Sequence, residues 1–373
     1  MLILYLLFGV IVLFLLLAYL SVYPFLIELL NNKVYFNKDV SKDHYMIAVV
    51  QSSKNMFLSK KVLMSERDTD FKENLKFFIG RGRKHPYFYY PKAFLYYGFL
   101  SHLESTKPSE INKLQAHFDR MLDDSGKPSF LIRFVDQVPF GMTALNLYIF
   151  TGDEKYRVFC DSIFEYLKNS YSSQNGILYR SSLDIQFNDV LGMICPFLFR
   201  YAISFNVGES AKMGLNQILL FYKNGVDKES SIPSHGYYLS SKVKLGSSNW
   251  GRGIGWYAYA LAYCPNELGI ISIKQDLFNS LLSLSLPDGT YSQFPGSSNV
   301  FDASSTVLIW YFMKDLDPNF ISKEEIIKVL SRYTTVDGCI DFTSGDTFGL
   351  NMYSRKFGFS ELSQGILLQL LNL

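Results

Sequence analysis

The residues of this chain that could do chemistry lie at or just before the starts of predicted helices. Aspartate and histidine can transfer protons, arginine can bind carboxylates and hydroxyl groups, and aromatic rings can stack on the C–H faces of a sugar. All of these residue types occur at such positions here, and a pocket that combined them would suit a sugar. The residues concerned are Tyr90, Asp136, Asp189, His235, Arg252 and Asp302, with Trp250 and Trp256 beside the arginine.

Each of these residues also has a structural interpretation. Asp136 and Asp189 each precede an apolar helical stretch, where an aspartate commonly caps the helix by accepting from free backbone N–H groups. Trp250 and Trp256 flank the glycine-rich segment 251–255 and could be packing aromatics at a close contact between helices. The same glycines do not form a GxGxxG motif after a strand, which argues against a dinucleotide site. Residue type alone therefore leaves both interpretations open.

The elements that must position these side chains are predicted to be helices joined in pairs. The clearest pair covers 138–167, where an apolar helix, the turn 151–153 and a second helix follow one another with a 3.6-residue period. Asp153 is placed to cap the second helix of this pair. Ser322 and Glu325 form a capping-box pattern before another helix. These patterns predict αα-hairpins.

Similar helical pairs recur about every fifty residues. The recurrence fits either an open α-solenoid or a closed (α/α)6 barrel. The barrel is favoured because the polar residues named above fall at the starts of the first helices of the pairs, and in a closed ring those starts converge on one mouth. We therefore expect an all-α fold, an (α/α)6 barrel of six helical hairpins. The pairs are drawn at 86–124, 138–167, 189–223, 249–286 and 303–333, with 41–80 and 359–372 together supplying the sixth.

Composition narrows the functional classes. The chain has 373 residues, 48% of them hydrophobic and 19% charged, which is enough apolar material for a large core and argues against disorder. Its formal net charge of +2 creates no field that would attract nucleic acid. The four cysteines lie far apart and predict buried, free thiols, and the five histidines show no metal-ligand clustering. We expect no metal and no cofactor.

The first 30 residues predict a membrane anchor. No charged side chain occurs from Met1 to Ile27, and the run from Leu2 to Leu20 is apolar and long enough to cross a bilayer. The stretch lacks the basic start and the A-x-A-like cleavage site of a signal peptide, which favours an anchor. The lysines that follow favour a single-pass protein with a cytoplasmic domain. We therefore divide the chain into a transmembrane anchor, 1–30, and one barrel domain, 31–373.

Four segments carry motifs whose order is more informative than any one of them. Residues 249–257 read Asn-Trp-Gly-Arg-Gly-Ile-Gly-Trp-Tyr and follow His235-Gly236. Residues 188–193 read Asn-Asp-Val-Leu-Gly-Met, residues 136–141 read Asp-Gln-Val-Pro-Phe-Gly, and residues 288–291 read Asp-Gly-Thr-Tyr. Together they resemble glycoside hydrolase families 88 and 105, the unsaturated glucuronyl and rhamnogalacturonyl hydrolases. The resemblance covers the chain from about Tyr89 to its C-terminus.

The resemblance implies an (α/α)6-barrel hydrolase whose substrate carries a 4,5-unsaturated uronic acid at its non-reducing end. In these families an aspartate protonates the double bond and then activates the water that adds to it. Carried over, Asp189 is this acid/base, Asp136 is its neighbouring carboxylate, and Arg252 would bind the uronate carboxylate or a ring hydroxyl. The other substrate-binding residues would be Tyr90, His235, Trp250, Trp256 and Asp302.

Two other functions stay open at this point. The barrel could be an inactive or drifted sugar-binding protein that serves surface-polysaccharide metabolism. It could also be another (α/α)6 enzyme, such as a polysaccharide lyase or an epimerase-like protein. In each case the expected partners are a glycan and, through the N-terminal helix, a membrane, and nucleic acid is not expected.

Overall fold

The computed structural model describes residues 1–30, 33–59, 90–103, 108–347 and 349–373, and it describes their side chains except at 2, 20–30, 103 and 108–110. The parts of the predicted helical pairs that fall at 60–89 and 104–107 lie outside the described residues.

The helix pairs form where local sequence signals begin and end them. Helices α6 (Phe140–Thr151) and α7 (Glu154–Ser170) are separated by a turn in which Gly152 adopts a φ of 66°. The Asp153 carboxylate accepts from the backbone N–H of Lys155 at 3.1 Å, as predicted for a cap. Ser322 and Glu325 form the predicted capping box at the start of α13. These local predictions are confirmed.

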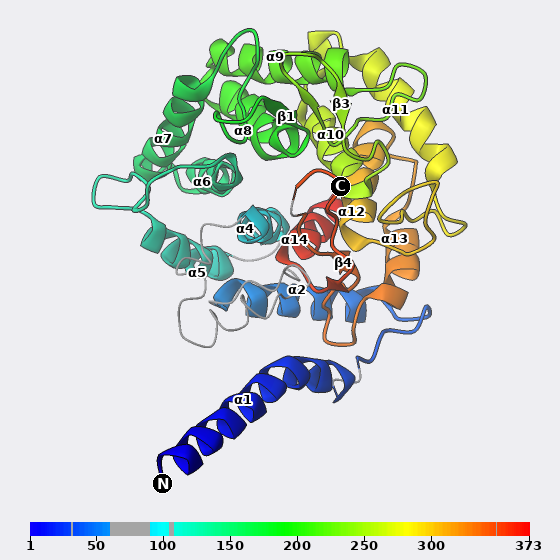
Figure 1. The fold of residues 1–373 in the computed structure, drawn as a ribbon. Helices are drawn as coiled ribbons and strands as arrows, with labels where there is room; N and C mark the ends of the chain where they lie inside the picture. Colours follow the sequence, from blue (N-terminus) through cyan, green and yellow to red (C-terminus); the bar gives the residue numbers. More distant parts are fainter. Residues whose placement is uncertain (31–32, 60–89, 104–107, 348) are drawn as a thin grey trace.

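Two concentric rings of helices make up the body of the molecule (Figure 1). The inner helices carry mostly buried side chains, whereas the outer helices bury one face against them and expose the other. The inner helices are α4 (Tyr90–Leu103), α6, α8 (Asp189–Phe205), α10 (Gly251–Tyr263), α12 (Ala303–Leu316) and α14 (Glu361–Leu370). The outer helices are α2 (Lys42–Leu58), α5 (Pro108–Phe118), α7, α9 (Gly208–Gly225), α11 (Ile271–Leu284) and α13 (Lys323–Leu330).

The inner ring is closed by a close crossing of α4 and α14. A Cβ atom on Gly98 of α4 would lie 2.0 Å from the carbonyl oxygen of Gly365 in α14, so only glycine fits at this contact. The sixth pair consists of α2 and α14, which the Gln364 side chain links by donating to the Val49 carbonyl at 3.2 Å. The closed helical barrel is therefore confirmed, and the open solenoid is excluded.

Short strands and turns connect the helices on the rim of the barrel, which the expectation of an all-α fold did not include. Strands β1 (Ile185–Phe187), β2 (Gly236–Tyr238) and β3 (Lys244–Leu245) form an antiparallel sheet in that order. Strands β4 (Thr343–Ser344) and β5 (Phe357–Gly358) form a second antiparallel pair. Single 3₁₀ turns lie at Asp119–Met121, Val135–Gln137, Asn266–Leu268 and Ser331–Tyr333.

Cysteine burial differs from the prediction at one position. Cys160, Cys195 and Cys264 are free and buried, as expected. Cys339 is also free but only partly buried, because it lies in the segment after α13 rather than inside a helix.

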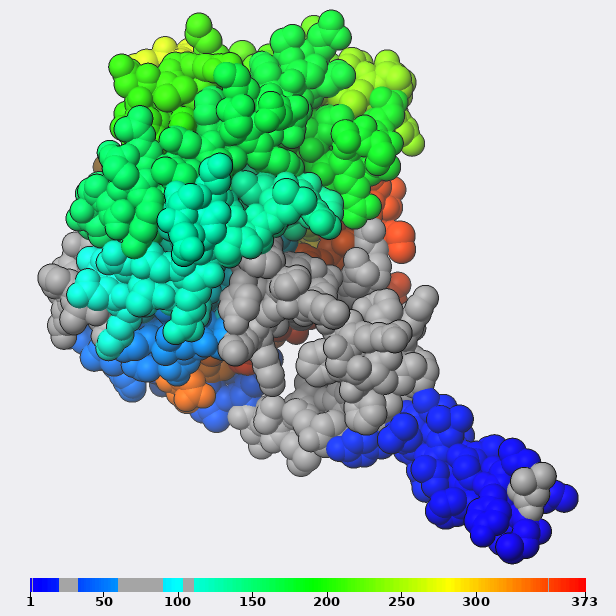
Figure 2. Space-filling view, turned by 90° about the vertical axis from the view of Figure 1, so that its left-hand side faces the viewer, coloured from blue at the N-terminus to red at the C-terminus, as the bar shows by residue number. Residues whose placement is uncertain are grey.

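Helix α1 (Leu2–Leu30) projects from the barrel (Figures 1 and 2). Its described apolar side chains are largely exposed, for example Ile3 at 75% and Phe14 at 70%. Within the described residues, no helix combines the length and the apolar character needed to cross a membrane. The transmembrane anchor stays a prediction.

Candidate functional site

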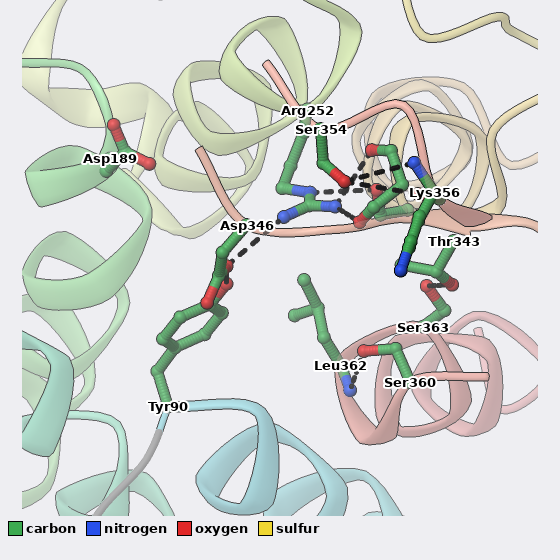
Figure 3. A network of polar contacts seen from close by, with 12 residues as sticks. Tyr90, Asp189, Arg252, Thr343, Asp346, Ser354, Lys356, Ser360, Leu362 and Ser363 are labelled. Atoms are coloured by element: carbon green, nitrogen blue, oxygen red, sulfur yellow. Dashed lines mark hydrogen bonds and ion pairs between the residues drawn. The ribbon is translucent and has the colours of Figure 1, made fainter. Parts of the chain in front are cut away.

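Several predicted site residues lie at the N-terminal ends of inner helices. Tyr90 and Asp189 are the first residues of α4 and α8, Arg252 is in the first turn of α10, and Asp302 caps α12. Because the inner helices lie side by side in the ring, these ends meet at one mouth of the barrel. Figure 3 shows Asp189 facing the group formed by Tyr90, Asp346 and Arg252.

Asp189 pairs with His235. The His235 Nε2 atom lies 3.4 Å from the Asp189 Oδ2 atom, and the two side chains are 2% and 18% exposed. The rim sheet sets this geometry, since the backbone N–H of Asn188 donates to the His235 carbonyl at 3.0 Å. Asn188 holds the N-cap position of α8, and Asp189 follows it as the first helical residue. Asp189 is therefore not the N-cap of α8. Its carboxylate is held beside a histidine and is partly exposed to solvent.

Asp136 lies in the 3₁₀ turn that precedes α6. The turn is closed by the Gln137 side chain, which accepts from the backbone N–H groups of Arg133 and Phe134 at 2.7 and 3.1 Å. The N-cap of α6 is Pro139, so Asp136 does not cap that helix.

Tyr179 is a partly buried tyrosine whose pKa is affected by the carboxylates of the site. Burial, followed by the charges of Asp136, Asp189 and Asp346, raises the pKa of Tyr179 far above its ordinary value. The Tyr179 phenol therefore stays protonated and can act as a donor. The sequence analysis did not select Tyr179, which lies in a loop without helical periodicity.

Arg252 is held almost completely inside the protein. Its Nε atom donates to the Ser304 hydroxyl at 3.0 Å, and its Nη2 atom donates to the carbonyl and, at 2.9 Å, to the hydroxyl of Ser344. Burial opposes its charge, but the carboxylates of Asp302, Asp346 and Asp189 favour it, and the pKa of Arg252 is above its ordinary value. The guanidinium is thus charged and rigidly oriented.

The carboxylate of Asp302 is used within the protein. Its side chain is fully buried and accepts from the backbone N–H groups of Ser304 and Ser344, each at 3.1 Å. The hydroxyl groups of Ser304, Ser305 and Ser344 also donate to it. Asp302 therefore caps α12 and orders the serines that hold the arginine. We assign this supporting role to it in place of the predicted sugar contact.

Asp346 completes the arrangement and was missed by the sequence analysis. The Tyr90 hydroxyl donates to the Asp346 Oδ1 atom at 2.6 Å, and the Arg252 Nη1 atom lies 3.5 Å from the same oxygen. Burial and the charge of Asp346 raise the pKa of Tyr90 well above its ordinary value, so the phenol stays a donor. Asp346 follows β4 in an irregular segment, where no periodic pattern marks it.

The tryptophans occupy two different environments. Trp250 packs on His235, with ring centroids 4.4 Å apart, and Tyr353 joins them at 5.6 Å from Trp250. Trp256 is 1% exposed and packs against Tyr90 and Phe94 inside the ring. Trp250 therefore supports the histidine of the site, and Trp256 supports Tyr90 from the core. Their predicted contacts with a sugar stay predictions.

The chain matches the family model described as Glycosyl Hydrolase Family 88 over residues 63–334. A comparison with curated proteins finds no significant match.

Solved structures share the fold at low sequence identity. A possible member of glycoside hydrolase family 105 from Klebsiella pneumoniae is 14% identical, with a TM-score of 0.71, and the match covers 90% of this chain and 93% of that one. A family 105 glycoside hydrolase from C. acetobutylicum is 17% identical, with a TM-score of 0.65 over 76% of this chain and 93% of that one. An unsaturated glucuronyl hydrolase from a Bacillus species, responsible for glycosaminoglycan degradation, is 14% identical, with a TM-score of 0.64 and coverage of 88% and 95%.

Proposed function

Since this chain belongs to glycosyl hydrolase family 88, we propose that it hydrolyses an oligosaccharide that ends in a 4,5-unsaturated uronic acid. The observation that supports this most directly is the partly exposed Asp189 carboxylate, which lies 3.4 Å from His235 at the mouth of a helical barrel. A single carboxyl group in this position can give a proton and take one back.

The reaction we propose is hydration followed by ring opening. Protonated Asp189 donates its proton to C4 of the double bond, and positive charge develops at C5 and the ring oxygen. The Asp189 carboxylate then accepts a proton from a water molecule as the water oxygen bonds to C5. The resulting hemiketal opens and releases the rest of the glycan.

The neighbouring residues support these steps. His235 is placed to stabilise the Asp189 carboxylate between the two proton transfers, and Asp136 and Asp346 add negative charge that favours a cationic transition state. The protonated Tyr179 is a donor for a sugar oxygen, and Tyr90 donates to Asp346 and so holds that carboxylate in place.

The function is tested with purified full-length protein and a 4,5-unsaturated uronyl disaccharide. Turnover removes the double bond and its ultraviolet absorbance. Asp189→Asn is expected to lower kcat by roughly 10²–10⁴-fold, because the amide cannot exchange a proton with the substrate. Asp276→Asn, on the exposed side of the outer helix α11, is the matched control and should leave kcat unchanged.

Two results would contradict the proposal. If wild type and Asp189→Asn are equally inert while the sugar still binds, the protein is a sugar-binding barrel without turnover. If products gain a double bond from a saturated polysaccharide, the protein is a lyase.

We also propose that α1 attaches the enzyme to a membrane as a single-pass anchor, with the barrel domain, 31–373, on the cytoplasmic side. The exposed apolar side chains of α1 and its position outside the ring support this proposal (Figure 2). The test uses a reporter that works only on the cytoplasmic side, fused after Leu373. We expect the reporter to be active and the fusion protein to be found in the membrane fraction. An active reporter that remains in the soluble fraction would contradict the anchor.

A further inference from the structure

The contacts of Arg252 restrict what it can bind. Its Nε atom is occupied by Ser304, and its Nη2 atom is occupied twice by Ser344. The Nη1 atom faces the Asp346 carboxylate at 3.5 Å. A bidentate contact with a substrate carboxylate needs two parallel N–H groups from one edge of the guanidinium. The two edges of the guanidinium that could form such a pair both include Nη2, which already donates to Ser344. A substrate carboxylate could therefore bind in this way only if Ser344 gave up its contact with Arg252.

The charge of Arg252 is also compensated from two sides. Asp302 lies behind it, joined through the hydroxyl groups of Ser304 and Ser344. Asp346 lies in front of it and is 25% exposed. A third carboxylate at this place would meet two carboxylates and one guanidinium, and the net interaction would be repulsive.

A sugar hydroxyl fits the same place well. It can accept from the Arg252 Nη1 atom and donate to Asp346 at the same time. Tyr90 and Arg252 both contact the Oδ1 atom of Asp346, and no described residue donates to its Oδ2 atom. Tyr90 therefore fixes the carboxylate with one oxygen while the other can accept from a ligand.

We propose that Asp346 is a specificity-determining residue that makes the Arg252 side of the site select a sugar hydroxyl and reject a carboxylate. The inference rests on the proposed function and deepens it. The uronic acid binds with its carboxyl group away from Arg252, and the enzyme accepts sugars in which that group is neutralised as an ester as readily as the free acid.

The test compares a 4,5-unsaturated uronyl disaccharide with its methyl ester, in which the carboxyl group carries no charge. Dissociation constants are measured by calorimetry with Asp189→Asn protein, which prevents turnover during the titration. With Asp346 present, the free acid is expected to bind no more tightly than the ester. Adding Asp346→Asn should shift the ratio toward the free acid by about tenfold, because the Nη1 atom of Arg252 then faces no carboxylate.

Two further variants separate charge selection from a loss of structure. Asp346→Glu keeps the charge and should return the ratio toward that of the parent protein, and Asp276→Asn should leave it unchanged. The inference is overturned by two results together. The free acid binds at least tenfold more tightly than the ester when Asp346 is present, and Asp346→Asn lowers this preference or leaves it unchanged. If the wild type still hydrolyses the disaccharide, that result rules out the role of Asp346 in selectivity and leaves the proposed function standing. If neither disaccharide binds nor reacts, the proposed function fails together with it.

Discussion

Two aspartates at the starts of inner helices differ in what they do. Asp302 occupies the N-cap position of α12 and is fully buried among N–H and O–H donors. Asp189 lies one position further into α8, where the rim sheet places its carboxylate next to His235. A shift of one residue relative to the helix start therefore separates a structural carboxylate from a candidate catalytic one.

Asp302→Asn is expected to destabilise the fold and to lower activity. Asparagine still caps the helix, but its amide nitrogen cannot accept from the serines and the charge facing Arg252 is lost. The free energy of unfolding should fall by about 1–3 kcal/mol. Urea denaturation measures the loss, and the KM for the uronyl disaccharide should rise because Arg252 is less well positioned.

The control for this variant is Asp153→Asn at the cap of α7, where the side chain is 42% exposed. We expect it to cost only a few tenths of a kcal/mol, because asparagine and aspartate are similar caps and water solvates the position. An equal loss in the two variants would show that the buried network around Asp302 contributes nothing beyond capping.

Closure of the ring depends on the α4–α14 contact. A Cβ atom on Gly365 would lie 2.3 Å from the carbonyl oxygen of Phe94, and backbone atoms cannot move aside as a side chain can. The same two helices are joined by the buried ion pair of Lys92 and Glu361 at 3.2 Å. Close packing and a buried ion pair together fix how the last helix meets the first helix of the inner ring.

Gly365→Ala is expected to cost about 3 kcal/mol or more of stability, at the upper end of what overpacking usually costs. The melting temperature and the urea midpoint should both fall. Gly208→Ala is the matched control, since no atom lies within 4 Å of its added Cβ atom at the start of α9. If both variants melt like wild type, the helices can separate at this crossing and the closure is looser than described.

At the scale of the whole molecule, the end of the barrel opposite the mouth is filled by a hydrogen-bonded polar cluster. Arg200 donates to the Tyr97 hydroxyl at 2.6 Å and to Asn146 at 2.7 Å. The Tyr263 hydroxyl lies 3.0 Å from that of Tyr97 and accepts from Tyr311 at 3.1 Å. Every inner helix contributes to the cluster, whose members are Tyr97, Asn146, Arg200, Tyr259, Tyr263, Tyr311 and Gln369.

This cluster predicts a loss of stability at alkaline pH. Burial, with the neighbouring phenols, raises the pKa of Tyr259 and Tyr263 well above the ordinary value of 10.0. Above that value the unfolded chain releases these protons while the folded protein keeps them, so unfolding becomes more favourable as pH rises. The free energy of unfolding should be constant below about pH 10 with respect to these groups and should decrease above it.

Urea denaturation at increasing pH, with tyrosinate absorbance recorded in the native state, checks this prediction. Tyr263→Phe removes one of the phenols and should reduce the slope of stability against pH. Native tyrosines that all ionise near their ordinary pKa would contradict the burial of the cluster.

The sequence by itself determined the helices, their pairing, the caps at Asp153 and Ser322 and the motifs that identify the family. These features depend on residues within about one helix or hairpin of one another, so periodicity and cap chemistry reveal them. It also selected Asp189, His235 and Arg252 through motifs that the resemblance made specific.

Only the tertiary structure decided which carboxylates face the site and which support it. Asp346 contacts Tyr90 across 256 positions of the chain, and Ser344 contacts Arg252 across 92. No local pattern encodes such a contact, because the two residues meet only when distant segments of the chain pack together in the barrel. Whether Arg252 binds a hydroxyl or a carboxylate depends on these two long-range contacts. The arginine motif alone therefore could not distinguish between the two kinds of ligand.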